Sequence, residues 1–103
     1  MPTLEACKEM IAQLSEAKKW SKDPNIKFLY AFVELGEAVD AWKKRKPPSK
    51  VIEEIIDAIY YLIHCAWCIN PQIDLDQLFI NKHKINYERR RKYPNDTAQR
   101  NYR

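Results

Sequence analysis

The chain has 103 residues, of which 46% are hydrophobic, so it can bury a core and wholesale disorder is excluded. A single glycine and few runs rich in valine or threonine favour one all-α domain. The net charge is +4, and no stretch approaches the roughly 18 uninterrupted apolar residues of a membrane span, so we expect no membrane partner. The opening MPTLEACKEM does not resemble a signal peptide, and we expect a cytoplasmic protein.

The first two predicted helices have clear start signals. Thr3 can cap the first helix, which should end before Ser21. Its apolar stripe follows the 3.6-residue helical period and consists of Leu4, Cys7, Met10, Ile11 and Leu14. Asp23 and Pro24 predict a second start, because aspartate caps a helix and proline suits the first position. The apolar face of this second helix consists of Phe28, Phe32, Leu35, Val39 and Trp42.

The KPPSK stretch, residues 46–50, ends the second helix, and Ser49 within it can cap a third helix. This third helix should run to about Ile69, before Asn70 and Pro71. Its side chains are apolar nearly all round, so we expect it to be buried on more than one side. Asp74 and Gln77 resemble a capping box for a fourth helix that continues through Tyr93. The prediction is therefore one four-helix, bundle-like domain over residues 1–95, followed by a polar tail, residues 96–103.

The third predicted helix also contains cysteines and a histidine. Cys65 and Cys68 form a CxxC pair, but only Cys7, His64 and His83 remain as further zinc ligands, and none has suitable spacing. Buried free thiols and a hydrogen-bonded core histidine are the more common roles for such residues. We therefore interpret these side chains as core, and the odd number of cysteines also fits a reducing setting.

Four acidic residues occupy matching positions on the second and third helices. Only a few residues join these helices, so they should form an antiparallel hairpin. The pair Glu34 and Glu37 lies about as far before the connection as the pair Glu54 and Asp57 lies after it. If the two faces point at each other, four carboxylates meet at one level.

An ordinary solvated face is the alternative for these acids, because Glu34 and Glu37 lie opposite the apolar face of their helix. However, the positions four residues away from these two glutamates hold no lysine or arginine. Asp57 lies on an apolar helix, so we expect it to be buried, where an unpaired carboxylate is costly. A divalent cation would supply the missing positive charge, and oxygen ligands favour Mg²⁺, with Mn²⁺ possible. Gly36, between the glutamates, would allow a neighbouring helix or a ligand to approach closely.

The segments ELGE (34–37), EIID (54–57), KHKIN (82–86) and RRRKYP (89–94) resemble the MazG-like superfamily of all-α nucleotide pyrophosphohydrolases, especially its dCTP pyrophosphatase branch. The resemblance spans about residues 3 to 95. It implies Mg²⁺-dependent hydrolysis of nucleoside triphosphates between the α and β phosphates, which releases a monophosphate and pyrophosphate. It also implies a homodimer or homotetramer whose active sites are completed near the subunit contact.

The resemblance also implies roles for individual residues. The metal ligands and catalytic carboxylates would be Glu34, Glu37, Glu54 and Asp57. The substrate-binding residues would be Lys82 and Asn86 at the phosphates and sugar, Tyr61 beside the nucleotide, Trp42 near the base, and one of Arg89, Arg90 and Arg91 at a phosphate. The residues alone leave other roles open, since Lys82 and Asn86 could be an exposed helix face and Tyr61 a packing residue.

Two other functions remain possible from the sequence. The chain could be a small nucleic-acid-binding module that uses KKRK, residues 43–46, and the arginine-rich carboxyl-terminal segment on backbone phosphates. It could also be a non-catalytic assembly module in which the acids pair with KKRK of a neighbouring subunit. Neither alternative requires a metal ion or a nucleotide, and the resemblance favours a nucleotide substrate over a nucleic-acid partner.

Overall fold

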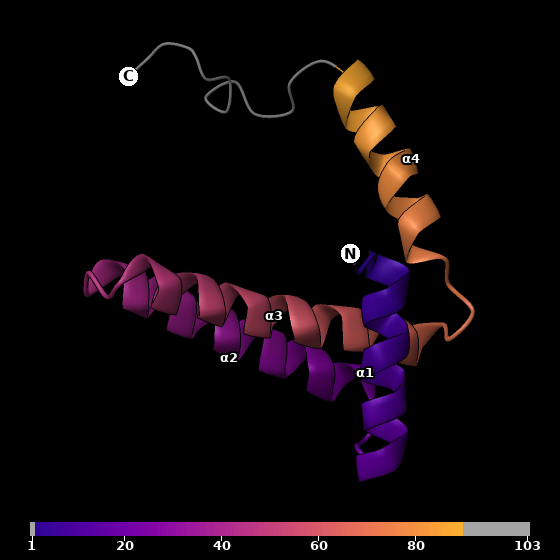
Figure 1. Ribbon diagram of the computed structural model, residues 1–103, viewed down its shortest axis with the longest axis horizontal. Coiled ribbons are helices and arrows are strands. Elements are labelled where there is room, and N and C mark those ends of the chain that lie inside the picture. Colours follow the sequence, from indigo (N-terminus) through magenta and orange to yellow (C-terminus); the bar gives the residue numbers. More distant parts are fainter. Residues whose placement is uncertain (1, 90–103) are drawn as a thin grey trace.

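The computed structural model describes residues 2–89 and confirms the all-α prediction (Figure 1). It contains the helices α1 (Leu4–Lys18), α2 (Pro24–Lys43), α3 (Pro48–Ile69) and α4 (Leu75–Glu88), and no strand within the described range. The predicted tail, residues 96–103, lies outside that range, as do Arg90 and Arg91.

Three of the predicted helix caps are present. The side chains of Thr3, Asp23 and Asp74 each accept a backbone hydrogen bond from the first turn of their helix, at 2.9–3.0 Å. Ser49 does not cap α3, because the helix already begins at Pro48, where the missing N–H of proline costs nothing. The side-chain amide of Gln77 donates to Asn81, and within residues 2–89 no hydrogen bond runs from the Asp74 N–H to the Gln77 oxygen, so the predicted capping box is not completed.

The predicted fourth helix is too long at its carboxyl end. α4 ends at Glu88, and Arg89 has an extended backbone with φ −84° and ψ 156°. The prediction that the helix continues through Tyr93 is therefore wrong at Arg89, and residues 90–93 lie outside the described range.

The hairpin of α2 and α3 forms the centre of the fold, and these two antiparallel helices share the largest contact (Figure 1). α1 packs across the carboxyl-terminal part of α3. α4 points away from the hairpin and, among the described helices, contacts α1 alone. The chain is thus four helices with a hairpin, as predicted, but α4 does not pack alongside the other three as in a closed bundle.

The core consists mainly of small residues where α2 meets α3. Its buried apolar residues include Ala31, Ala38, Ala41, Val51, Ala58 and Ile63. Because alanines line the contact, the two helices pack closely and leave the large side chains outside it. The predicted apolar face of α2, from Phe28 to Trp42, is therefore exposed within the single chain.

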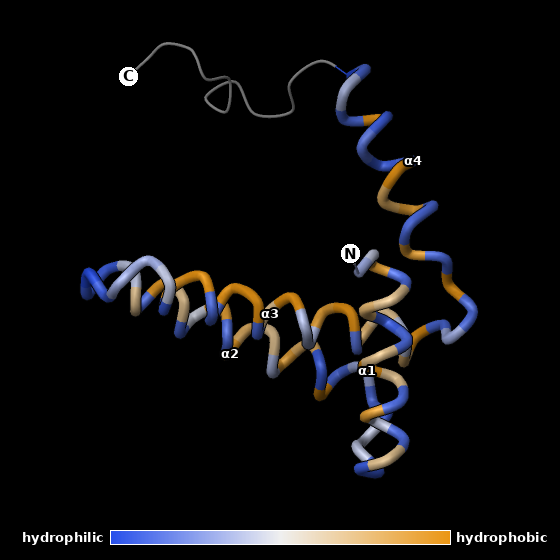
Figure 2. Tube along the Cα trace, in the orientation of Figure 1, coloured by the Kyte–Doolittle hydropathy of each residue, from blue (hydrophilic) through white to orange (hydrophobic). Residues whose placement is uncertain are grey.

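The other predicted apolar faces are also only partly buried. On α1 the described core includes Ile11, Lys8 and Ser15, whereas Met10 and Leu14 are exposed. The prediction that α3 is buried on more than one side is wrong for the single chain, whose exposed residues include Ile52, Ile55, Ile56, Ile59 and Leu62. Figure 2 shows this apolar character along α3. None of the described helices combines the length and the apolar character needed to cross a membrane.

Candidate metal centre

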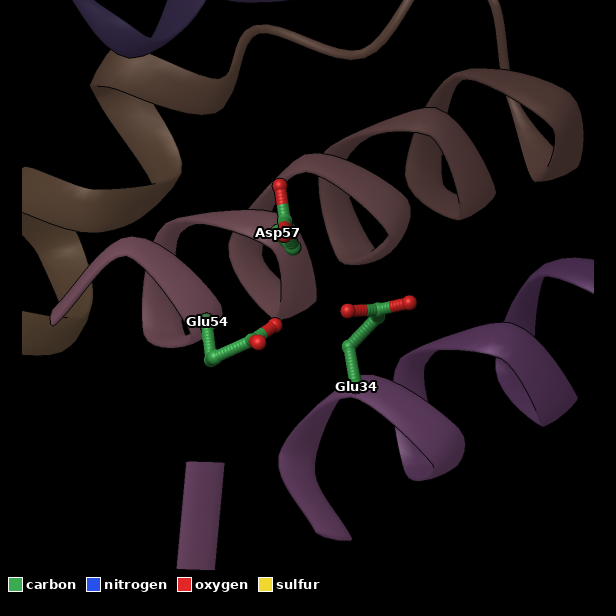
Figure 3. A group of neighbouring side chains, drawn as sticks. All are labelled: Glu34, Glu54 and Asp57. Atoms are coloured by element: carbon green, nitrogen blue, oxygen red, sulfur yellow. The ribbon is translucent and has the colours of Figure 1, made fainter. Parts of the chain in front are cut away.

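Three carboxylates meet between α2 and α3 (Figure 3). Glu34 comes from α2, and Glu54 and Asp57 come from α3. One carboxylate oxygen of each residue lies within 4.8 Å of those of the other two. Glu54 and Asp57 are three residues apart and therefore share a helix face, and the antiparallel connection brings Glu34 to the same height. This group contains three of the four carboxylates that were predicted to converge, and Glu37 is not among them.

Glu37 is outside the converging group but close enough to affect it. The pKa of Glu34 is raised above its usual value, first because the carboxyl group loses contact with water and then because of the charges of Glu37, Asp57 and Glu54. A cation between these oxygens would remove that repulsion. Of the four predicted carboxylates, three thus converge, and the fourth, Glu37, acts on Glu34 only through its charge.

The burial of the three carboxylates differs from our expectation. Glu54 is buried and Asp57 is exposed, so the prediction that Asp57 is buried is wrong for the single chain. The ammonium nitrogen of Lys50 lies 3.2 Å from a carboxylate oxygen of Glu54, and the pKa of Lys50 is raised by this pairing. This ion pair could have been predicted from the sequence, since Lys50 is four residues before Glu54. Within residues 2–89, Glu34 and Asp57 form no ion pair.

The donor set suits a hard divalent cation. Three carboxylates with little compensating charge are typical ligands of Mg²⁺ or Mn²⁺, which also keep coordinated waters for a substrate. In the part of the chain that the structure describes, no other group of three or more Asp, Glu, His or Cys side chains converges in this way. Burial raises the pKa of Cys65 and of Cys68, so both are thiols at neutral pH and poor zinc ligands.

A cavity of about 320 Å³ lies about one helical turn from the carboxylates, because Tyr30 and Tyr61 in its wall are four residues from Glu34 and Asp57. It is lined by Trp20, Ser21, Ile26, Lys27, Tyr30 and Tyr61. The rings of Tyr30 and Tyr61 meet edge to face, with centroids 5.3 Å apart. The pKa of Tyr61 is raised by burial first and then by the charge of Glu34, as expected for a tyrosine that lines the cavity and faces the carboxylate group.

Sequence reasoning found Tyr61 but missed the rest of this cavity. Lys27 is only 4% exposed, and its ammonium nitrogen lies 5.9 Å from the centre of the Tyr30 ring. Tyr30 precedes Glu34 by four residues and Tyr61 follows Asp57 by four, so the antiparallel hairpin pairs the two tyrosines as it pairs the acids. That mirrored spacing could have identified Tyr30 from the sequence. Nothing comparable in the sequence identifies Trp20.

The remaining predicted substrate-binding residues lie elsewhere in the single chain. Trp42 lines an apolar groove with Leu35 and Ile52 and is not part of the cavity beside the carboxylates. Lys82, Asn86 and Arg89 are exposed, on or at the end of α4, which makes no contact with α2 or α3 within the described residues. The structure therefore brings together the acids and Tyr61 and leaves these four apart.

His64 is a core residue, as interpreted from the sequence. Its Nε2 lies 3.0 Å from the Ser15 hydroxyl, and its ring packs between Trp20 and Trp67 with centroid distances of 5.9 Å. Its pKa is lowered by burial first and by the positive charge of Lys27 second. The imidazole is thus neutral at physiological pH and contributes packing.

Comparison with family models, with curated proteins and with solved structures found no match for this chain. The resemblance to the MazG-like superfamily therefore stays a prediction that rests on the four motifs.

Proposed function

We propose that this protein is a Mg²⁺-dependent nucleoside triphosphate pyrophosphohydrolase that converts an NTP or dNTP to the monophosphate and pyrophosphate. The observation that carries the proposal is the convergence of Glu34, Glu54 and Asp57 within 4.8 Å, next to a cavity lined by aromatic rings. The motif resemblance supplies the reaction class. Turnover of this kind would serve to remove unwanted nucleotides or to control the nucleotide pool.

The carboxylates of Glu34, Glu54 and Asp57 would hold the metal, which when bound would neutralise triphosphate charge and lower the pKa of coordinated water. Glu37 lies next to this group and can accept a proton from the attacking water. Lys50 fixes the carboxylate of Glu54, since its ammonium group lies 3.2 Å away. The chain thus separates metal ligands from a nearby carboxylate that can act as a base.

The cavity beside the carboxylates would take the nucleoside part of the substrate. Its volume of about 320 Å³ is at the lower end of small-molecule sites. Trp20, Tyr30 and Tyr61 offer ring faces and edges to a planar base, and such stacking tolerates different bases. Lys27 adds a positive charge at the cavity wall. This arrangement supports a nucleotide more than an inorganic polyphosphate, which would gain nothing from the aromatic rings.

The phosphate contacts implied for Lys82, Asn86 and Arg89 need a second chain in this proposal. α4 stands apart from the α2–α3 hairpin of its own chain (Figure 1). These residues would therefore act on the triphosphate bound to a neighbouring copy in a homodimer or homotetramer.

The first experiment is a screen of common and modified NTPs and dNTPs with Mg²⁺, reading pyrophosphate and monophosphate separately. We expect equal amounts of the two products. Asp57→Asn should reduce kcat by about 100-fold or more, the loss typical of removing one group that stabilises charge in the transition state. It should also weaken Mg²⁺ binding in calorimetry.

Asp40→Asn is the matched control, because Asp40 is an exposed aspartate that pairs with Lys44 at 3.1 Å, away from the converging carboxylates. It should leave both turnover and Mg²⁺ binding unchanged. Release of orthophosphate alone, or full activity of Asp57→Asn with Mg²⁺, would contradict the proposal.

One observation favours the alternative of nucleic acid binding. Trp42, Lys43, Arg45 and Lys46 line an open hollow of about 510 Å³ at the turn between α2 and α3. Basic side chains beside an aromatic ring suit a phosphate backbone and a stacked base. Binding to single- or double-stranded DNA that weakens steeply with salt, together with no triphosphate turnover, would select this function.

A further inference from the structure

Lys27 is a buried lysine of α2 whose charge has no described partner. It is only 4% exposed, and its ammonium group forms no ion pair or hydrogen bond within residues 2–89. The nearest acid in the sequence, Asp23, instead accepts a hydrogen bond from the Asn25 N–H at 2.9 Å. Polar groups buried this deeply usually have a hydrogen-bond partner. The missing acceptor points to a ligand, because Lys27 lines the same cavity as Tyr61.

We propose that Lys27 contacts the base of the nucleotide, and that the cavity accepts bases with a carbonyl oxygen at the edge far from the sugar. Uracil and thymine carry such an oxygen, whereas cytosine carries an amino group at the same position. The inference rests on the proposed function for the placement of a nucleotide, and it names the class of base, which the proposed function leaves open.

The position of Lys27 along α2 fits contact with a base and not with the phosphates. Lys27 precedes Glu34 by seven residues, which is two helical turns and about 10 Å along the helix axis. Tyr30 lies between them in the sequence, and its ring centre is 5.9 Å from the Lys27 ammonium nitrogen. A nucleotide whose phosphates lie at the carboxylates would therefore place its sugar near the tyrosines and the far edge of its base near Lys27.

The polar groups of the cavity favour an oxygen on the ligand. The Lys27 ammonium group and the Trp20 indole N–H can only donate hydrogen bonds, whereas the tyrosine hydroxyls can donate or accept. The Ser21 hydroxyl accepts from the Asp23 N–H at 3.1 Å, so its own proton can be donated to a ligand. Among the described residues, no carboxylate lines the cavity. A carbonyl oxygen would satisfy these donors, and an amino group would not.

Lys27 would distinguish uracil from cytosine, which the aromatic rings cannot do. Both pyrimidines have a π face, so stacking on the rings favours neither. Opposite Lys27, the cytosine amino group would set one donor against another and leave both without an acceptor. A hydrogen bond to a charged group changes affinity by about 10- to 150-fold. The expected preference is opposite to the base for which the resembled dCTP pyrophosphatase branch is named.

The test compares dUTP with dCTP, because their bases differ at this far edge. Binding to the full chain is measured by calorimetry with Mg²⁺ and the non-hydrolysable α,β-imido analogues of the two triphosphates. Turnover of dUTP and dCTP themselves is measured by pyrophosphate release. We expect the uracil analogue to bind at least about 10-fold more tightly than the cytosine analogue, and kcat/KM to show the same preference.

Lys27→Met keeps an unbranched side chain and removes the donor. It should weaken binding of the uracil analogue by at least about 10-fold and bring the ratio of the two dissociation constants close to 1. Lys27→Gln should also lower the ratio, because its amide oxygen can accept from the cytosine amino group, and it replaces Lys27→Met if that variant loses its helices in circular dichroism.

Lys22→Met is the matched control. Lys22 is an exposed lysine that pairs with Glu16 at 3.2 Å and does not line the cavity. This variant should keep the wild-type ratio of dissociation constants. Loss of the uracil preference in Lys22→Met would overturn the inference, since the preference would then not depend on the cavity.

The remaining outcomes separate the inference from the proposed function. Equal binding of the two analogues, tighter binding of the cytosine analogue, or a uracil preference that survives substitution of Lys27 would overturn the inference, even if both triphosphates are hydrolysed. A uracil preference that depends on Lys27, with no hydrolysis of either triphosphate, would support the base contact and contradict the proposed function. Absence of binding by either analogue would overturn both.

Discussion

At the scale of single residues, Glu34 is the carboxylate of the converging group whose ionised form is disfavoured by its surroundings. Its carboxyl group loses contact with water and faces three other acids, so its folded-state pKa lies above the usual value. A raised pKa means that the ionised form is less stable in the folded chain than in the unfolded chain. Without a metal, the charge of Glu34 therefore destabilises the fold at neutral pH.

Glu34→Gln should raise the melting temperature of the metal-free protein at pH 7. The gain should be a few tenths of a kcal/mol, about 1 to 3 °C, as for removal of a like-charge contact. As the pH falls through the raised pKa of Glu34, the wild-type carboxylate takes up a proton and the difference should shrink. Thermal unfolding across a pH series measures both effects.

Mg²⁺ should reverse the order, because it stabilises only the chain that binds it well. Glu53→Gln is the control, since Glu53 is exposed, pairs with Lys50 at 3.4 Å and is not part of the converging group. It should bring no gain in stability. A lower melting temperature for metal-free Glu34→Gln would show that the carboxylate is already compensated.

The acids of the centre were predictable because their positions depend only on helix period and connection length. Glu34, Glu54 and Asp57 follow from the antiparallel hairpin alone. The burial of Asp57 was not predictable, because an apolar helix does not reveal whether its own chain or another covers it. A Cβ atom at Gly36 would meet nothing within 4 Å, so no part of the chain within residues 2–89 makes the close approach that was expected there.

At the scale of elements, local hydrogen bonds determine where the helices begin, whereas tertiary packing determines which helix faces are buried. Thr3, Asp23 and Asp74 cap their helices as predicted, because a side chain reaching its own first turn needs no other part of the fold. The core faces were predicted from the helical spacing of large apolar residues, and the closest packing instead uses alanines of α2 and α3. Large apolar residues indicate a buried face without stating what buries it.

The junction of α1 and α4 gives an element-scale prediction. Glu5 accepts a hydrogen bond from the first turn of α4 and pairs with the buried Lys8. Glu5→Ala leaves Lys8 without its ion pair and the amide of Leu75 without its acceptor. We expect faster hydrogen exchange throughout α4 and unchanged exchange in α2 and α3, because α4 has no other helical contact among the described residues.

Glu9→Ala is the control for this measurement, since Glu9 is an exposed glutamate on α1 with no described hydrogen bond or ion pair. Its exchange pattern should match the wild type. Equal protection of α4 in Glu5→Ala would mean that contacts other than this junction hold the helix.

At the scale of the whole molecule, the two sides of one hairpin have different chemistry. One side gathers carboxylates and tyrosines, and the other is an apolar groove. From the sequence, the carboxylates and Tyr61 were predicted on one side, whereas the apolar residues of the other side were interpreted as an internal core. α4, with Lys82 and Asn86, belongs to neither side within its own chain. In the proposed enzyme, Lys82 and Asn86 would therefore have to reach the substrate from the α4 of another copy.

This dependence can be tested by mixing two inactive variants. Asp57→Asn removes a proposed metal ligand, and Lys82→Ala removes the proposed phosphate contact on α4. If α4 acts on a neighbouring copy, each mixed dimer has one site with both defects and one site with neither. Random pairing of equal amounts should then restore about a quarter of wild-type activity. Co-expression with two different tags allows the mixed dimer to be purified and assayed directly.

Lys84→Ala serves as the control, because Lys84 is an exposed lysine two residues along α4 to which the resemblance assigns no contact with the substrate. It should be active alone. No recovery in the mixed dimer would mean that Lys82 serves the site of its own chain, which would require α4 to leave α1 and fold onto the hairpin. Full activity of Lys82→Ala alone would instead remove α4 from the catalytic proposal while leaving the carboxylate centre intact.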